Sequence, residues 1–139
     1  MTSFTIHNGA DIVPARYFLR RRVSGAQWTP TTRARGVAAL TILAELILSS
    51  GTYDVVSVAT TKTDNVDVLK LSCTIRRPGD PAIIDQAHAK LEQLSNELNF
   101  TDSDDHVTIN VHIWVSDYSG INNEESDQEE YADEPNYEA

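Results

Sequence analysis

Residues 107–115 constrain the fold more than any other part of this chain, because apolar and polar side chains alternate along them without a break. One side carries Val107, Ile109, Val111, Ile113 and Val115, and the other carries Thr108, Asn110, His112 and Trp114. Successive side chains of a β-strand point to opposite faces of a sheet. The segment therefore predicts a strand of an antiparallel sheet, with one face packed against helices and the other face more polar.

Three other segments have strand patterns. Residues 4–7 alternate in the same way and predict a short first strand. Residues 53–61 are rich in Val and Thr, and residues 68–75 alternate again. Because residues 63–65 are Thr-Asp-Asn, which favours a turn, we expect the second and third strands to form a hairpin.

Two helices are predicted between the first strand and this hairpin. Asp11 is a candidate cap for the first helix, and Gly25 follows its end. Thr29 and Pro30 open the second helix, which is apolar nearly all round and stops at Gly51. Since a helix without a broad polar face is usually a buried one, we expect the second helix to lie in the core.

A third helix is predicted after the hairpin, with Asp80 as its cap and Pro81 in its first turn. Its apolar residues recur every three or four positions, at Ile84, Ala87, Leu91, Leu94 and Leu98. The element order is β-α-α-β-β-α-β. We therefore predict an α+β two-layer sandwich, an antiparallel-rich sheet of about four strands with helices on one face. A ferredoxin-like split β-α-β with an extra N-terminal helix has this order.

Charge divides the chain into two parts. The formal net charge is −10, from 11 Lys and Arg against 21 Asp and Glu. Residues 1–100 hold all 11 basic residues and 9 of the acidic ones, whereas residues 101–139 hold 12 acidic residues and no basic one. Residues 119–139 are also poor in aliphatic side chains. We therefore predict a domain over residues 1–118, followed by a disordered acidic tail that is attracted to the basic part of the domain.

The single cysteine, Cys73, has no partner for an internal disulfide and alternates with apolar residues, so we expect it to be reduced and buried. The N-terminus lacks the basic and apolar regions of a signal peptide. The longest apolar run, residues 37–48, is shorter than the ~20 residues that a membrane span needs. We therefore expect a cytoplasmic protein that does not associate with a membrane.

The predicted second helix carries one polar stripe, because Thr41, Glu45 and Ser49 are spaced by four. Residues 45–49 read Glu-Leu-Ile-Leu-Ser, which resembles the Glu-Leu-x-x-Asn motif of the GHKL ATPase superfamily, in particular its small bacterial anti-sigma regulatory members. In that family the Glu is a general base and the Asn a magnesium ligand. The resemblance implies a nucleotide site at this stripe, with Ser49 in place of the Asn. The sandwich of this family is a second architecture with the predicted element order.

The resemblance extends to the first helix, which has an Ala-Arg-x-Phe-Leu-Arg run at residues 15–20, and covers the element order over about residues 4–116. The family places an Asp-x-Gly-x-Gly box after the third strand, whereas residues 72–79 read Ser-Cys-Thr-Ile-Arg-Arg-Pro-Gly. The resemblance therefore implies a degenerate member that does not hydrolyse ATP. The alternative for the polar stripe is the solvent-facing side of an amphipathic helix.

Six of the 11 basic residues lie within the first 35 positions, where Asp11 is the only acid. They are Arg16, Arg20, Arg21, Arg22, Arg33 and Arg35. Residues 16 and 20 share a helix face, so we predict a positive patch that binds phosphates, an acidic partner or the chain's own tail. The alternative is a solvated helix surface. We do not expect nucleic acid as a partner, because no recognised binding module accompanies the arginines and the acidic C-terminal part would repel phosphate.

His112 and Trp114 lie on the polar side of residues 107–115. An exposed Trp in the middle of a strand favours a binding or dimer face. The alternative is that Trp114 packs under the first helix or the tail. The four histidines are scattered along the chain without the spacing of a metal site, so we expect no metal and no cofactor.

Together these patterns predict a non-catalytic regulatory protein-binding module that resembles an anti-sigma or GHKL-type domain without ATP hydrolysis. The alternative is a small ferredoxin-like interaction or assembly module that forms homo-oligomers or part of a larger complex. In both cases the expected partner is another protein, which includes a second copy of this chain. We do not favour an enzyme, because the sequence shows no recognisable pair of catalytic acid and base and no set of metal ligands.

Overall fold

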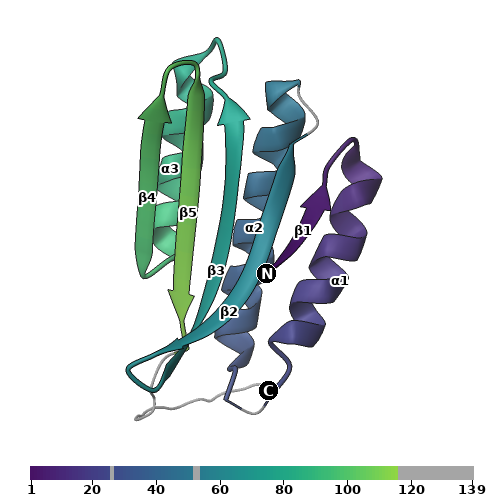
Figure 1. Cartoon of the computed structure of the whole chain (residues 1–139), viewed down its shortest axis with the longest axis vertical. Helices are drawn as coiled ribbons and strands as arrows, with labels where there is room; N and C mark the ends of the chain where they lie inside the picture. The colour runs from purple at the N-terminus through teal and green to yellow at the C-terminus, as the bar shows by residue number, and fades with distance from the viewer. Residues whose placement is uncertain (26, 52–53, 116–139) are drawn as a thin grey trace, which may run out of the picture.

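The structure is a computed structural model in which residues 1–25, 27–51 and 54–115 are described. Three predictions reach outside those ranges: the tail over residues 119–139, the end of the domain over residues 1–118, and the first residue of the strand over residues 53–61. The described chain folds into two layers, a sheet and a layer of helices (Figure 1).

Within the described ranges the chain forms one antiparallel sheet of five strands, in the order β1-β2-β3-β5-β4. The strands are β1 (Thr2–Thr5), β2 (Val55–Thr63), β3 (Val66–Arg76), β4 (Glu97–Ser103) and β5 (His106–Trp114). The predicted hairpin of the second and third strands is confirmed. Its turn residues, Asp64 and Asn65, have φ angles of 52° and 67°, which is the backbone shape of a tight two-residue turn that matches the twist of the strands.

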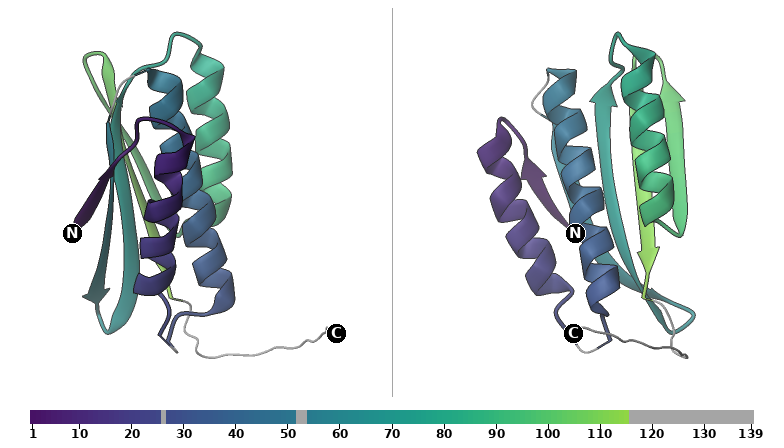
Figure 2. Two further views of the ribbon diagram at one scale, coloured as in Figure 1. Left: turned by 90° about the vertical axis from the view of Figure 1, so that its right-hand side faces the viewer. Right: turned by 180° about the vertical axis from the view of Figure 1, so that it is seen from behind.

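Three helices in the described chain cover one face of this sheet and leave the other face open (Figure 2). They are α1 (Ile12–Arg22), α2 (Pro30–Ser50) and α3 (Pro81–Leu94), and a short 3-10 turn over Gly9–Asp11 precedes α1. α2 lies between the other two helices and also packs against β3. No helix in these ranges is both long enough and apolar enough to span a membrane. The predicted α+β two-layer sandwich is confirmed, with five strands rather than about four.

α2 begins and ends where the sequence predicts. The Thr29 hydroxyl oxygen accepts a hydrogen bond from the Thr32 backbone N–H at 3.1 Å, and Pro30 occupies the first turn, where a backbone N–H would have no helical partner. Gly51 ends the helix with a φ of 75°, a left-handed conformation that glycine adopts without strain. The largest buried side chains of the helix are Leu40, Leu43, Leu46 and Ile47.

The prediction for the third helix is wrong at its C-terminal end. α3 ends at Leu94, and Ser95 has an extended backbone, with φ −117° and ψ 158°. Leu98 therefore belongs to β4, where it and Phe100 pack against the hydrophobic core. The helical spacing is overridden by a tertiary contact, because β4 pairs with β5 along its whole length through a turn in which Asp104 has a φ of 51°.

Asp11 immediately precedes α1, but its side chain makes no capping hydrogen bond to that helix. Its carboxylate accepts hydrogen bonds from the backbone N–H groups of His7 and Asn8 at 2.7 and 3.2 Å. The Asn8 side chain in turn accepts from the Ala10 N–H at 2.9 Å. The side chains of Asn8 and Asp11 therefore cap the 3-10 turn, whereas the sequence predicts that Asp11 caps the α-helix.

The connections differ between the two halves of the sheet. β3 and β4 run parallel and are joined by α3, and β5 lies between them, which makes a split β-α-β unit. β1 and β2 are direct antiparallel neighbours, although α1 and α2 join them. The described chain therefore contains the split unit once, in its C-terminal half.

Gly36 lets α2 lie close to β3 and α1. A Cβ atom at this position would lie 2.7 Å from Leu69 Cδ2 and 3.3 Å from Leu19 Cδ2. Both leucines are fully buried, so they cannot move aside without disturbing the packed core. The missing side chain at Gly36 thus allows two helices and the sheet to meet at one point.

Replacing Gly36 by Val is expected to destabilise the fold by about 1 to 3 kcal/mol, because the added carbons overfill a packed core. Ala34→Val is the matched control on the same helix, since Ala34 is exposed and the change costs at most about 0.7 kcal/mol of helix propensity. Urea denaturation followed by circular dichroism measures both variants. An unchanged midpoint for Gly36→Val would contradict the close packing.

Cys73 lies on β3 and is 4% exposed, so its predicted burial is confirmed. Removal from water, and secondarily the Asp54 carboxylate, raise the pKa of its thiol to about 12. The thiolate is the reactive form of cysteine, and a raised pKa keeps the group protonated near neutral pH.

We therefore expect almost no reaction between the native protein and a disulfide reagent at pH 8. In guanidinium chloride the same thiol should react fully, because a cysteine in an unfolded chain has a pKa near ~8.5. The absorbance of the chromophore that the reagent releases measures the extent of both reactions. Complete reaction of the native protein within minutes would show that Cys73 is reachable.

Candidate functional site

Small polar side chains line most of the open face of the sheet. One row across the five strands consists of Ser3, Ser57, Ser72, Asn110 and Asn99. The next row includes Thr74, Thr108 and Thr101. Hydrogen bonds join the hydroxyls of Ser3 and Ser57 at 3.0 Å and those of Thr74 and Thr108 at 2.9 Å. Among the described residues this part of the face offers mainly hydroxyl and amide groups, together with the exposed Val55 of β2.

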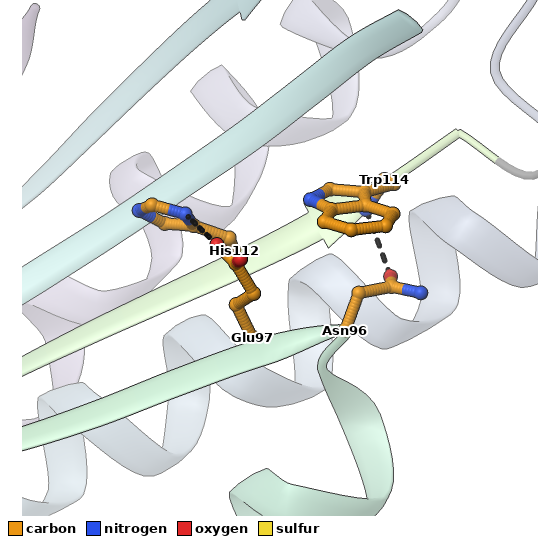
Figure 3. Close-up of polar contacts among 4 residues, drawn as sticks. All are labelled: Asn96, Glu97, His112 and Trp114. Carbon is orange, nitrogen blue, oxygen red and sulfur yellow. Dashed lines mark hydrogen bonds and ion pairs between the residues drawn. The ribbon is translucent and has the colours of Figure 1, made fainter. Parts of the chain in front are cut away.

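The character of the open face changes at Trp114, near the end of β5. Trp114 is 41% exposed. Its register partner on β3, Val68, is 4% exposed but is not part of the main core cluster. The Trp114 backbone N–H donates a hydrogen bond to Asn96 Oδ1 at 2.9 Å, which ties the end of β5 to the residue before β4 (Figure 3). A partly exposed indole beside a buried valine is thus an apolar spot on a polar face.

A histidine and a carboxylate lie next to this spot. His112 and Glu97 are register partners on β5 and β4, and His112 Nδ1 lies 3.0 Å from Glu97 Oε1 (Figure 3). A carboxylate accepts hydrogen bonds, so this contact places a proton on Nδ1 and leaves Nε2 for a ligand or solvent. The Glu97 side chain is 60% exposed, so water screens the pair and its contribution to stability is small.

A hollow of about 310 Å³ lies between the indole and the His112–Glu97 pair. It is lined by Thr63, Asp64, Val66, Val68, Lys70, Glu97, His112 and Trp114. The valines and the indole supply apolar surface, and the charged side chains of Asp64, Lys70 and Glu97 come from a turn and two different strands. A second hollow of about 620 Å³ lies against Asn96–Asn99, Asn110 and His112. His112 therefore borders both hollows.

The site brings together apolar, charged and hydrogen-bonding groups. Among the described residues, no three His, Cys, Asp or Glu side chains gather closely enough to hold a metal ion. A histidine held by a carboxylate also occurs in catalytic triads, but there the second ring nitrogen contacts a nucleophile. In the described part of the chain the His112 ring bonds Glu97 alone. The site therefore offers an apolar anchor with charged and hydrogen-bonding groups around it.

The predicted polar stripe of α2 lies elsewhere. Glu45 and Ser49 are exposed, and the half-buried Thr41 donates its hydroxyl proton to the Val37 carbonyl at 2.8 Å. None of the stripe residues lines either hollow of the open face. At the end of β3, where the GHKL family has its nucleotide box, the Arg77 guanidinium instead pairs with Asp102 at 2.6 Å.

The six predicted arginines lie on α1 and α2, in the layer opposite the open face. Arg20 and Arg33 line one groove of about 510 Å³ between these helices. Arg21 lies over the Tyr17 ring, with 5.7 Å between its guanidinium carbon and the ring centroid. The structure thus separates the predicted sites: the arginines share one layer, and His112 and Trp114 share the other.

Sequence reasoning missed Glu97 of β4 and Asn96, the residue before that strand. It also missed Lys70 and Val68, which stand beside β5 only through the register of β3. The available signal was the alternation of Leu98 and Phe100 with polar residues after Ser95. That alternation identifies β4 but does not identify its partner strand.

The fold resembles that of a solved structure. A chain in the crystal structure of the SiaB–SiaC complex from Pseudomonas aeruginosa matches it with a TM-score of 0.53 at 12% sequence identity, covering 83% of this chain and 90% of that chain. At this identity the similarity concerns the fold alone. No protein-family model matches the sequence, and the comparison with curated proteins gives no match.

The two tryptophans test the assignment of the open face. Trp28 is 4% exposed and Trp114 is 41% exposed. In a Trp28→Phe variant, which retains Trp114, acrylamide should quench the fluorescence strongly. In a Trp114→Phe variant, which retains Trp28, quenching should be weak because the ring is shielded from the solute. Equal quenching of the two variants would contradict an exposed Trp114.

Proposed function

We propose that this chain is a non-catalytic regulatory protein-binding module, and that a partner protein docks on the open face of the sheet around Trp114. The observation that carries the proposal is the partly exposed indole beside the 310 Å³ hollow. Tryptophans are the most enriched anchors of protein interfaces, where they fill pockets that exclude water. The polar rows on the rest of this face suit the rim of such an interface.

The expected energy of docking fits this role. A tryptophan buries up to about 250 Å² of surface, and covering the exposed part of Trp114 removes roughly 100 Å² from water. At about 25 cal/mol per Å² this contributes roughly 2.5 kcal/mol. Such a gain anchors a reversible complex when neighbouring contacts add to it.

The lining indicates the chemistry of the partner. Two carboxylates, Asp64 and Glu97, face one ammonium group, Lys70, around the hollow. A partner that places an apolar side chain against Trp114, with a basic side chain beside it toward Glu97, complements both features. The solved chain with a similar fold comes from a complex of two proteins, which supports a protein as the partner class.

The proposal includes the loss of ATP hydrolysis that the GHKL resemblance implies. Ser49 stands where that family has its magnesium-binding Asn. Arg77 and Asp102 form an ion pair beyond the end of β3, where the family has an Asp and flexible glycines. Both differences favour a domain that retains the sandwich and uses it for binding.

The test compares Trp114→Ser with Val13→Ser, which removes an equally prominent apolar side chain from α1; Val13 is 62% exposed. A protein captured by the full chain is identified, produced pure and titrated against each variant. We expect Trp114→Ser to weaken its binding by tenfold or more, about 1.4 kcal/mol, and Val13→Ser to leave it unchanged. Glu97→Lys should also weaken binding, because it reverses the charge that faces the partner.

Thermal unfolding accompanies the titration, so that a loss of binding is not confused with a loss of folding. Addition of magnesium and ATP at millimolar concentration should leave the unfolding temperature unchanged, because a ligand that does not bind the native state cannot stabilise it. An ATP-dependent rise would argue against the loss of nucleotide chemistry. If the Trp114→Ser variant and the parent chain bind the partner equally well, the partner does not dock on the open face around Trp114.

Self-association is the second candidate, as expected for an assembly module. β4 is an edge strand of the sheet, so the backbone groups on its outer side have no partner strand among the described residues. Light scattering distinguishes the candidates. A dimer that dissociates on Trp114→Ser would assign the same face to a second copy of this chain, whereas a monomer favours a different partner.

A further inference from the structure

The groove between α1 and α2 carries positive charge that the described chain does not neutralise. It is lined by Arg20, Ser24, Arg33, Ala34, Val37 and Ala38. Among the described residues, the ion pairs involve Lys62, Arg77 and His112, and none involves an arginine of α1 or α2. Asp11, the one acid near these arginines in sequence, already accepts two backbone hydrogen bonds. The guanidinium groups of the groove are therefore available to carboxylates.

A local contact holds Arg33 in place without supplying an acidic partner. Arg33 Nη1 donates a hydrogen bond to the Trp28 carbonyl at 2.7 Å, which fixes the guanidinium at the start of α2. Nε of Arg16 is buried and has no hydrogen-bond partner among the described residues. Arg20 is exposed one turn after Arg16 on the same helix face. The groove thus presents cations on both helices with small apolar side chains between them.

The acidic part of the chain begins near the same end of the molecule. The described chain stops at Val115, whose backbone N–H donates to the Asp67 carbonyl at 2.9 Å. The end of β5, the end of α1 and the start of α2 lie at one end of the fold (Figures 1 and 2). Residues 116–123 alone can extend over roughly 27 Å at ~3.4 Å per residue. Residues 124–138 hold eight acidic side chains and no basic one.

We propose that the acidic segment 119–139 docks in the α1–α2 groove of its own chain, with its carboxylates on Arg20 and Arg33. Exposed Arg–carboxylate pairs are individually weak. A tethered segment, however, reaches an effective concentration in the millimolar range. The segment therefore occupies the groove unless salt or a competing acidic partner displaces it. This surface is separate from the face around Trp114, so the inference stands or fails independently of the proposed function.

The test places one spin label in the full chain. In a Ser126→Cys variant the label attaches to the new thiol, because Cys73 is buried. We expect strong paramagnetic broadening of the backbone amide signals of Ala34, Val37 and Ala38 in the groove. The exposed α3 residues Ala82 and Ala89 should broaden little. Raising the salt concentration to 1 M shortens the screening length to about 3 Å and should remove most of the groove broadening.

Two matched comparisons isolate the charge. In a chain labelled at the same position, with the eight acids of residues 124–138 changed to Asn or Gln, the groove broadening should fall several-fold. Ala34→Glu places a carboxylate in the groove, and Arg20→Gln removes a cation from it. In chains that keep the native acidic tail, both changes should reduce the groove broadening. Lys90→Gln removes an exposed cation from α3 and should leave it unchanged.

Three results would overturn the proposal. The first is equal groove broadening in the acidic and neutralised chains. That result would mean that the attachment of the tail to the domain alone, without any attraction between charges, brings the label near the groove. The second is broadening of α3 as strong as that of the groove. The third is broadening that arises between molecules in a mixture of labelled chains and isotopically enriched unlabelled chains, which would assign the groove to a second copy.

Discussion

The packing of α2 against the sheet is the contact on which the rest of the structure depends. α2 is the central helix, and Gly36 lets it lie against Leu69 of β3 and Leu19 of α1 without an intervening side chain. α1 and α3 then take the places on either side of it. Because this layer covers one face of the sheet only, every second residue of each strand is left on a face that no helix shields, and that face is available for function.

The two outer surfaces of the sandwich have different chemistry. Among the described residues, the open sheet face is uncharged over most of its area and carries the exposed Trp114 beside the His112–Glu97 pair. The opposite surface carries the arginines of α1 and α2, of which Arg20 and Arg33 line a groove that also has small apolar residues. An indole anchor and a cationic groove attract different groups, so the two surfaces suit two separate contacts. The acidic segment of the chain complements one of them and not the other.

Much of the fold was predictable because its signals are local. The ends of α2 follow from Thr29, Pro30 and Gly51, and the alternation over residues 107–115 identifies β5 and its open side. β4 was not predictable in the same way, because Leu98 also continues the three-and-four spacing of the preceding helix. The pairing with β5 decides between the two, and that pairing involves residues distant in sequence. The candidate site depends on the same pairing, since it is what brings Glu97 to His112.

The α+β class, the burial of Cys73 and the division between a mixed-charge N-terminal part and an acidic C-terminal segment are evident from the amino-acid sequence. These follow from periodicity, capping and composition, which act over a few residues or over whole segments. Which side chains become neighbours depends instead on tertiary contacts. Strand order and register place Trp114 beside Val68, and helix packing brings Arg20 and Arg33 to one groove. The physical reason is that backbone pairing and core packing join residues far apart in the chain, and neither leaves a local pattern in the sequence.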